Sequence, residues 1–195
     1  MKHHSLLCAN VLSLMALFWS SCFAANLCLD GPPVKTSPSE CCETPALIDP
    51  PIMMDCFQKW GEQTKRQSRM EGIPRGCCVA ECAMNATKLL TGGKINRKEM
   101  KKIFLASANS TPQWKPIVKK TLEECLKQAD GNKEEIEAGA KLLPSYEGEK
   151  ICHPISGNIL RCMRMKLFTK CPAGIFRGGS DCDQLKQYHA ACPLN

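Results

Sequence analysis

Apolar residues recur at three- and four-residue steps along most of the chain after residue 55, and no segment alternates apolar and polar residues for long. This period is typical of amphipathic α-helices, whose apolar side chains gather on one face. The clearest stretch starts at Thr111-Pro112, a capping residue followed by a proline at the first helical position, and ends at Asp130-Gly131. The pattern predicts an all-α fold of six to eight short helices, over residues 55–66, 76–90, 97–105, 112–130, 133–143, 157–170 and 181–188.

Local signals refine these boundaries. Asn96 is followed three residues later by Glu99, which is typical of a capping box at a helix N-terminus, and Asn132 stands in the same relation to Glu135. Residues 26–52 are rich in proline, which lacks the N–H group that a helix interior needs, so this stretch is predicted to be irregular.

The first residues of the chain predict a processed N-terminus. A short basic start precedes an apolar stretch from Leu6 to Trp19, and small residues stand at Cys22 and Ala24, the positions that precede a signal-peptidase cut. This stretch is too short for a membrane anchor, and no later segment is long and apolar enough to span a bilayer. The chain is accordingly divided into a signal peptide (1–24), a Pro- and Cys-rich arm (25–52), a helical domain (53–172) and a C-terminal extension packed on the same domain (173–195).

The chain contains 15 cysteines, of which Cys8 and Cys22 leave with the signal peptide. A secreted protein with so many thiols is expected to be cross-linked by disulfides, about six here, with one cysteine left over. Cys78 and Cys82 lie on one face of a predicted helix with Cβ atoms about 5–6 Å apart, whereas a disulfide needs roughly 3.5–4.5 Å. They should therefore bond two different elements and make this helix a hub, and Cys77, which points about 100° away, needs a third partner.

Disulfides between helices also affect whether the fold can enclose a cavity. Helices this short are marginal by themselves, and each disulfide stabilises by about 2–4 kcal/mol. Several of them can hold the helices around an apolar cavity instead of a solid core.

Other interpretations of this cysteine pattern have less support in the sequence. The residues between Cys78 and Cys82 lack the His-Asp pair of secreted phospholipases, and the chain has no Cys-X-Cys of plant lipid-transfer proteins. A zinc site could be drawn from Cys77, Cys78, Cys82 and either His153 or His189, but an oxidising compartment favours disulfides. A leftover thiol is more often a bystander than a nucleophile. No enzyme activity, metal or cofactor is predicted.

The net charge of +7 is spread over short basic runs such as Lys101-Lys102 and Lys119-Lys120. These runs alternate with apolar residues at helical spacing, so solvated helix faces explain them better than a nucleic-acid site does.

The order of cysteines resembles a known family. After Cys78-X3-Cys82 come 42 residues to Cys125, 26 to Cys152, 9 to Cys162 and 8 to Cys171, with Pro172 directly after it and 9 more residues to Cys182. This arrangement, over residues 56–192, resembles the Plus-C subgroup of insect odorant-binding proteins, best known from mosquitoes.

The resemblance implies a disulfide pairing. In the six-cysteine members the first core cysteine bonds the third, the second the fifth, and the fourth the sixth. Carried over, these bonds are Cys56–Cys82, Cys78–Cys162 and Cys125–Cys171. Three extra bridges would use six of the seven remaining cysteines, with Cys182 and Cys192 expected to bond the N-terminal arm or the Cys77 side of the hub helix; the seven are Cys28, Cys41, Cys42, Cys77, Cys152, Cys182 and Cys192.

The resemblance also implies a secreted, extracellular carrier that binds small hydrophobic odorants or semiochemicals in a helical cavity and takes them through aqueous lymph to olfactory receptors, as a monomer or homodimer. Soft methionines and broad aromatics suit an adaptable pocket. The expected pocket residues, each equally open to ordinary core packing, are Phe57, Trp60, Met100, Ile103, Phe104, Trp114, Ile117, Val118, Met163 and Leu167.

Weaker local signals complete the picture. Asn85 and Asn109 begin glycosylation sequons, and Asn109 is the better candidate because it lies in a predicted loop. His153 and His189 could support acid-triggered release, although two histidines at the surface without a role are the simpler interpretation.

Two alternatives to an odorant carrier stay open. One is the same scaffold as a carrier of lipids or other hydrophobic compounds outside olfaction. The other is a disulfide-rich secreted factor that acts through protein contacts and has no cavity.

Overall fold

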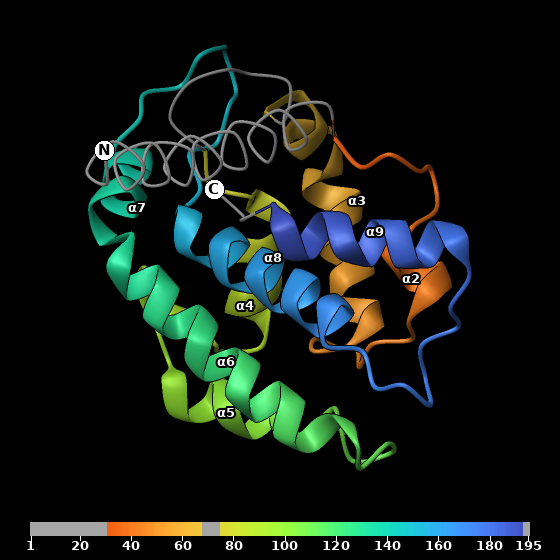
Figure 1. The fold of residues 1–195 in the computed structure, drawn as a ribbon. Coiled ribbons are helices and arrows are strands. Elements are labelled where there is room, and N and C mark those ends of the chain that lie inside the picture. Colours follow the sequence, from red (N-terminus) through yellow and green to blue (C-terminus); the bar gives the residue numbers. More distant parts are fainter. Residues whose placement is uncertain (1–30, 68–74, 193–195) are drawn as a thin grey trace, which may run out of the picture. The chain divides into compact units, whose positions relative to one another are not determined.

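The computed structural model describes residues 31–67 and 75–192, and the predicted signal peptide and Cys28 lie outside these ranges. The described chain forms two compact units: residues 44–173 make the larger one, and residues 31–43 with 174–192 make the smaller one. Helices dominate both, as the ribbon in Figure 1 shows, so the all-α prediction is confirmed. The described residues contain one small sheet, a two-stranded hairpin in the larger unit. The four-part domain division made from the sequence stays a prediction.

In the larger unit the chain begins with α3 (Pro50–Gln67), which starts five residues earlier than expected. Pro50 and Pro51 were taken as signs of irregular structure, but they stand in the first turn, where a missing N–H costs nothing. The helix runs antiparallel to α4 (Cys78–Ala86): Cys56 bonds Cys82, and one end of Gln63 reaches Cys78. The Cys56–Cys82 bond implied by the family resemblance is thereby confirmed.

The end of α4 differs from the expected helix to Leu90. Lys88 has a φ of 58°, and this left-handed residue stops the helix, with the Leu89 N–H donating back to the Met84 carbonyl over 2.7 Å. The chain then forms the hairpin of β1 (Leu90–Thr91) and β2 (Lys94–Ile95). Gly92 and Gly93 make its turn with φ of 56° and 76°, a conformation that other residues rarely adopt.

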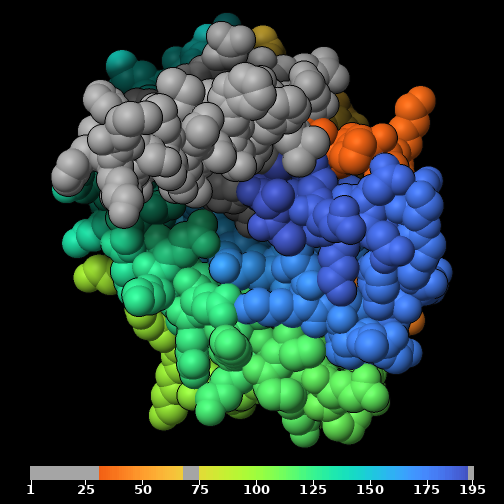
Figure 2. Space-filling view, viewed as in Figure 1, coloured from red at the N-terminus to blue at the C-terminus, as the bar shows by residue number. Residues whose placement is uncertain are grey.

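Three further helices pack beside one another. Asn96 caps α5 (Arg97–Ala106) as predicted, since its side chain accepts from the Glu99 N–H. It is followed by α6 (Trp114–Gly131), which starts later than Thr111-Pro112, and by α8 (Pro154–Thr169). α6 lies between α5 and α8 in the ribbon, and the surface view in Figure 2 shows the side chains of α6, in green, meeting those of α8, in lighter blue. A short α7 (Lys133–Ala140) follows α6 and packs on α8.

Two expected disulfides are wrong. Cys78 bonds Cys152, not Cys162, and Cys125 bonds Cys162, not Cys171. α6 and α8 run antiparallel with Cys125 directly opposite Cys162, their Cα atoms 5.7 Å apart. Cys171 lies nine residues further on, about 13 Å along a helix axis, which exceeds the roughly 7 Å between Cα atoms that a disulfide can bridge.

Close backbone contact explains the partner of Cys78. A Cβ atom on Gly76 would lie 1.7 Å from the carbonyl oxygen of Cys152, so only glycine allows this approach. It brings Cys152, just before α8, beside the start of α4, with 5.2 Å between the Cα atoms of Cys78 and Cys152. Cys162, eight residues into α8, is about 12 Å beyond that point. The hub prediction itself holds, because Cys78 and Cys82 bond different elements.

Cys77 was expected to need a partner, and this is also wrong, since it is a free thiol among the residues that the structure describes. It stands at the N-cap of α4 and packs against Gly157 of α8, where a Cβ atom would approach the Cys77 Cβ to 3.0 Å.

The smaller unit joins two distant segments. α2 (Pro38–Cys41) is linked to α9 (Ser180–Ala191) by the Cys41–Cys182 disulfide, with 5.4 Å between the Cα atoms. This confirms that Cys182 bonds the N-terminal arm. The arm, predicted to be irregular, contains helical residues in its described part: α2, whose N-cap Ser37 forms a capping box with Glu40, and the first turn of α3.

Backbone pairing continues next to this disulfide. Cys42 forms an isolated antiparallel bridge with Phe176, and the Arg177 N–H donates to the Cys41 carbonyl over 2.9 Å. Cys42, Cys171 and Cys192 are disulfide-bonded as well.

Candidate functional site

The candidate ligand site is the apolar interior of the larger unit. Six of the ten expected pocket residues are fully buried there, two on each of α5, α6 and α8, with relative exposures of 0–2%; they are Met100, Phe104, Trp114, Val118, Met163 and Leu167. They lie three or four residues apart within each helix, so each pair occupies one helix face. The structure brings these residues to the inner faces of helices that pack beside one another.

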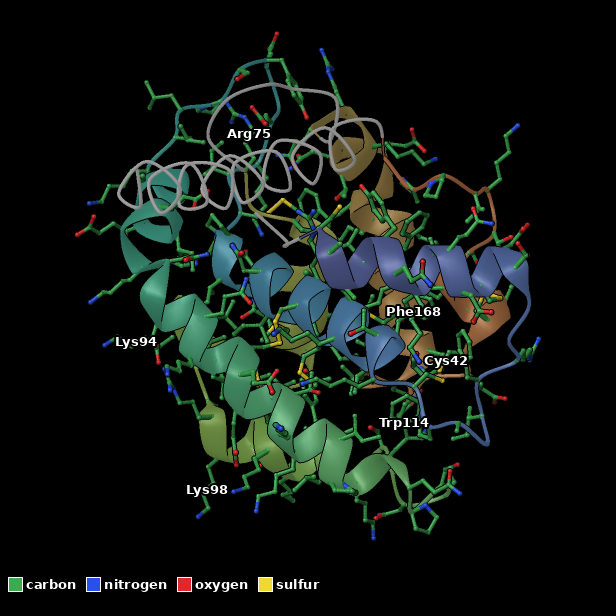
Figure 3. The ribbon with its side chains drawn as sticks, viewed as in Figure 1. Cys42, Arg75, Lys94, Lys98, Trp114 and Phe168 are labelled. Carbon is green, nitrogen blue, oxygen red and sulfur yellow. A yellow bond between two sulfur atoms is a disulfide. The ribbon has the colours of Figure 1, made fainter. Side chains whose placement is uncertain are left out.

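Because α6 and α8 are antiparallel, the first residues of α6 lie beside the last residues of α8. Trp114 begins α6 and Phe168 ends α8, and Figure 3 shows both at the same end of the helix pair. The Cys125–Cys162 disulfide fixes the middle of the pair, so the wide Trp114 and Phe168 rings are held at one end of the interior.

Ion pairs close the outer edge of the same helix pair. Glu124 of α6 accepts from Lys170 at 2.6 Å and from Lys166 at 3.3 Å. The hydrogen bond from Lys170, with help from Lys166, holds the pKa of Glu124 below its usual range, although burial by itself would raise it. The negative form of this carboxylate therefore helps to fix α8 against α6.

Several interior residues were missed as pocket candidates. Met84, Leu89, Ile159 and Phe168 are fully buried. The helical spacing of Met84 and Ile159 was visible in the sequence, but spacing alone cannot tell which buried faces meet. With Met100 and Met163, Met84 makes three completely buried methionines on α4, α5 and α8. Methionine is flexible and polarizable, so this interior can adapt to different apolar shapes.

Two buried hydroxyls in this interior lack hydrogen bonds. Thr121 on α6 and Ser156 on α8 have a relative exposure of 0%, and neither side-chain oxygen has a partner in the part of the chain that the structure describes. A buried hydroxyl without a partner costs about 1–3 kcal/mol. A water molecule or the oxygen atom of a ligand beside Thr121 would recover part of this energy.

The other four expected pocket residues are placed differently. Phe57 on α3 is 50% exposed, and its ring lies over Gly61 of its own helix. Trp60 is half-buried, with the ammonium groups of Lys59 and Lys150 within 5.5 Å of its ring centre. Ile103 and Ile117 are partly buried on α5 and α6. The role of all ten residues in ligand binding stays a prediction.

A second polar cluster ties the end of α3 to the loop before α8. The side chain of Glu149 is completely buried, and it accepts hydrogen bonds from Gln67, from the Ser145 N–H and from Arg75. Burial by itself would raise the pKa of Glu149, but these donors and the positive charges of Arg75 and Arg66 together lower it below the ordinary range. Glu149 is therefore a buried, ionised anchor.

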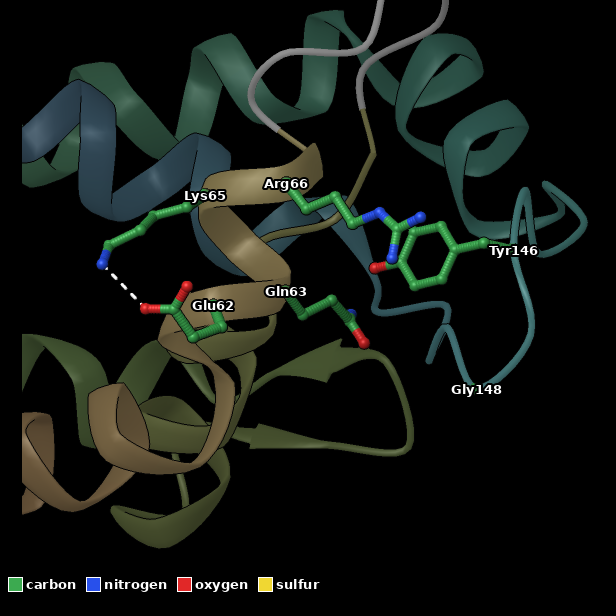
Figure 4. A pocket seen from close by; sticks show the side chains of 6 residues that line it. All are labelled: Glu62, Gln63, Lys65, Arg66, Tyr146 and Gly148. Carbon is green, nitrogen blue, oxygen red and sulfur yellow. Dashed lines mark hydrogen bonds and ion pairs between the residues drawn. The ribbon is translucent and has the colours of Figure 1, made fainter.

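The described residues of the larger unit line at least two surface pockets. One, of about 650 Å³, lies beside the end of α3 and is drawn in Figure 4. The other, of about 350 Å³, lies near the hairpin and includes Glu81, Asn85 and His153. His153 caps α8, since its Nδ1 accepts from the Ile155 N–H over 3.3 Å, and this is a structural role for one of the two histidines singled out. Asn85 and Asn109 are both exposed.

The zinc alternative is wrong for the set that was considered, because Cys78 and Cys82 are both in disulfides. Among the residues that the structure describes, no three His, Cys, Asp or Glu side chains gather where they could hold a metal ion. Within the same residues, no helix is both long enough and apolar enough to cross a bilayer.

Comparison with known proteins agrees with this disulfide-clamped helical interior. Residues 45–188 match the model of the family described as AgamOBP47-like, and the chain belongs to this family of insect odorant-binding proteins. Odorant-binding protein 47 of Anopheles gambiae is 55% identical over 195 residues, which cover 100% of this chain and 85% of that protein. General odorant-binding protein 67 of the same mosquito is 22% identical over 150 residues, 75% of this chain and 69% of that protein. The resemblance to insect odorant-binding proteins found in the cysteine spacing is thus confirmed.

Proposed function

We propose that this protein is a secreted carrier that binds small hydrophobic odorants or semiochemicals in the interior of its larger unit and transports them through aqueous lymph to olfactory receptors. The observation that carries the proposal is the 55% identity to Odorant-binding protein 47 along the whole chain. Such identity makes the same fold and the same general activity the best-supported assignment, and no catalytic step is part of it.

The structure supplies a physical basis for such a carrier. Disulfides at the start and in the middle of α4 and between α6 and α8 hold short helices together, so they do not depend on the tightest possible core. The interior that they enclose is lined by methionines and aromatic rings that can repack around a guest. The unpartnered Thr121 hydroxyl offers one polar contact in these apolar surroundings.

A displacement assay with an apolar fluorescent probe, N-phenyl-1-naphthylamine, tests the proposal. The mature protein should bind the probe saturably, and small apolar volatiles should displace it. A protein that binds neither the probe nor any volatile, with its disulfides intact, would rule out the carrier and favour the protein-interaction factor.

A matched pair of methionines locates the site. Met163→Ala removes a fully buried side chain of α8, whereas Met54→Ala removes one that is 58% exposed on α3. We expect the buried change to alter probe affinity several-fold and the exposed one to leave it unchanged. Met163→Leu nearly conserves volume and guards against a folding defect in the alanine variant. Equal effects of Met163→Leu and Met54→Ala on affinity would place the probe elsewhere.

Secretion belongs to the same proposal. Expression of the full chain in insect cells should release a protein into the medium that begins at Ala25, after the predicted cut. Retention inside the cell, or release with the leader still attached, would contradict it.

A further inference from the structure

The larger of these two surface pockets is lined by other residues than the apolar interior proposed for the carrier. It lies beside the C-terminal half of α3 and has a volume of about 650 Å³, within the usual range for small-molecule sites. Its lining includes three charged residues and comes from one helix and one loop, namely Glu62, Gln63, Lys65, Arg66, Tyr146 and Gly148. It differs in this respect from the apolar interior between α5, α6 and α8.

Arg66 is already positioned in this pocket. Its guanidinium carbon lies 3.7 Å from the centre of the Tyr146 ring, and Figure 4 shows the planar group over the ring. The guanidinium forms no hydrogen bond with any residue that the structure describes. A stacked guanidinium keeps its N–H donors in one plane and available, which is the geometry that binds a carboxylate through two parallel hydrogen bonds.

Among the residues that the structure describes, Arg66 forms no ion pair with the carboxylates around it. Glu62 is paired with Lys65 at 2.8 Å, and Figure 4 shows this pair directed away from Tyr146. Glu149 has its own partner in Arg75 at 3.3 Å. Glu62 and Glu149 thus have closer partners than Arg66, and Glu147, between the lining residues Tyr146 and Gly148, is exposed to solvent.

The wall beside Arg66 is fixed in place. The Gln63 amide donates to the Lys150 carbonyl over 2.9 Å and accepts from the Lys150 N–H over 3.0 Å. Since both ends of this amide are engaged, Gln63 shapes the pocket without competing for its ligand. Arg66 is left as the principal donor to a guest.

We propose that the pocket between Arg66 and Tyr146 binds a small organic molecule with a single carboxylate, which the Arg66 guanidinium holds through two hydrogen bonds. A single carboxylate matches the one planar guanidinium, whereas a phosphate dianion would add a second negative charge close to Glu62 and Glu149. This site is separate from the apolar interior, so the carrier function does not depend on it.

The test is a titration of the mature protein with hexanoate, followed through the Nε–H resonance of Arg66 in a ¹⁵N–¹H spectrum. Hexanoate should shift this resonance saturably, while 1-hexanol and inorganic phosphate at the same concentrations should not. Arg66→Gln should weaken hexanoate binding by about 10-fold or more, since two charge-assisted hydrogen bonds are lost. Arg66→Lys, which keeps the charge without the planar fork, should weaken it by a smaller factor.

Lys98, exposed on α5 and labelled in Figure 3, gives the matched control. Lys98→Gln removes the same charge elsewhere and should leave hexanoate affinity unchanged. Equal weakening by Lys98→Gln and Arg66→Gln would reduce the effect to net charge and overturn the proposal, and so would phosphate binding as tight as that of hexanoate. If 1-hexanol and hexanoate both bind and Arg66→Gln affects neither, the ligand enters the apolar interior; that result would overturn this site and leave the carrier function standing.

Discussion

The two units of this protein are stabilised in different ways. The larger unit buries aromatic rings, methionines and aliphatic side chains from α4 to α8, and its disulfides add to this apolar core. In the smaller unit the buried apolar residues are four cysteines and Leu185, among the residues described there. A unit that cannot bury enough apolar surface depends on cross-links, as small secreted domains do. The cysteines therefore serve two purposes: in the larger unit they help to shape an apolar interior, and in the smaller unit they replace one.

Removing the largest core side chain should break the larger unit alone. Trp114 is 2% exposed, and Trp114→Ala is expected to destabilise α5, α6 and α8 by about 3–5 kcal/mol, because contacts are lost and a cavity is left. Hydrogen exchange measured by mass spectrometry should speed up in these helices and stay as in the wild type in α9. Faster exchange in α9 to the same extent would show that the two units unfold together. Phe57→Ala, at a half-exposed aromatic residue, is the control.

Removing a disulfide should reduce exchange protection more in the smaller unit than in the larger one. The double change Cys41→Ser and Cys182→Ser opens a link across 141 residues and should cost the smaller unit about 2–5 kcal/mol, enough to remove exchange protection from α9. The matched pair Cys125→Ser and Cys162→Ser opens a link across 37 residues in the larger unit. There α6 and α8 should keep most of their protection, because buried side chains still hold them together. Equal loss of protection in both cases would contradict the difference drawn between the units.

Acid should weaken the larger unit by a smaller amount. The folded-state pKa values of Glu149 and Glu124 are below the ordinary value of 4.5, so their stabilisation is present above that pH and is lost as the pH falls towards the folded-state values. Chemical denaturation between pH 6 and pH 3 should therefore show falling stability below about pH 4.5. Glu149→Gln should make the free energy of unfolding depend less on pH. Glu147→Gln, which changes an exposed carboxylate two residues earlier, should leave this pH dependence unchanged. An unchanged slope in Glu149→Gln would remove this carboxylate from the explanation.

Much of the fold was predictable, and for local reasons. Helical periodicity located the helices, the Asn96 cap marked the start of α5, and the distance between Cβ atoms four residues apart required Cys78 and Cys82 to bond different partners. The predicted helix boundaries were wrong where a residue type fits more than one local structure. Pro50 fits the first turn of a helix as well as it fits a loop, and nothing in its sequence surroundings marks Lys88 as a left-handed helix stop.

The candidate site was predictable in part. Residues such as Met100, Val118 and Met163 were expected in the interior and are buried there, because an apolar helix face has to be covered. Phe57 was expected with them but lies half-exposed, since its face of α3 is not the one that the other helices cover. The Arg66–Tyr146 stack joins residues 80 positions apart, and no sequence pattern indicates such a contact.

The sequence by itself determined the class of the protein: its expected secretion, its helices, its cross-linked character and its family through the order of cysteines. The tertiary structure alone decided which thiols meet, giving Cys152 to Cys78, Cys162 to Cys125 and no partner to Cys77. The reason is physical. Helix faces follow from a repeat of 3.6 residues, whereas disulfide partners depend on where packed helices cross, and a crossing shifted by nine residues moves a thiol by about 13 Å.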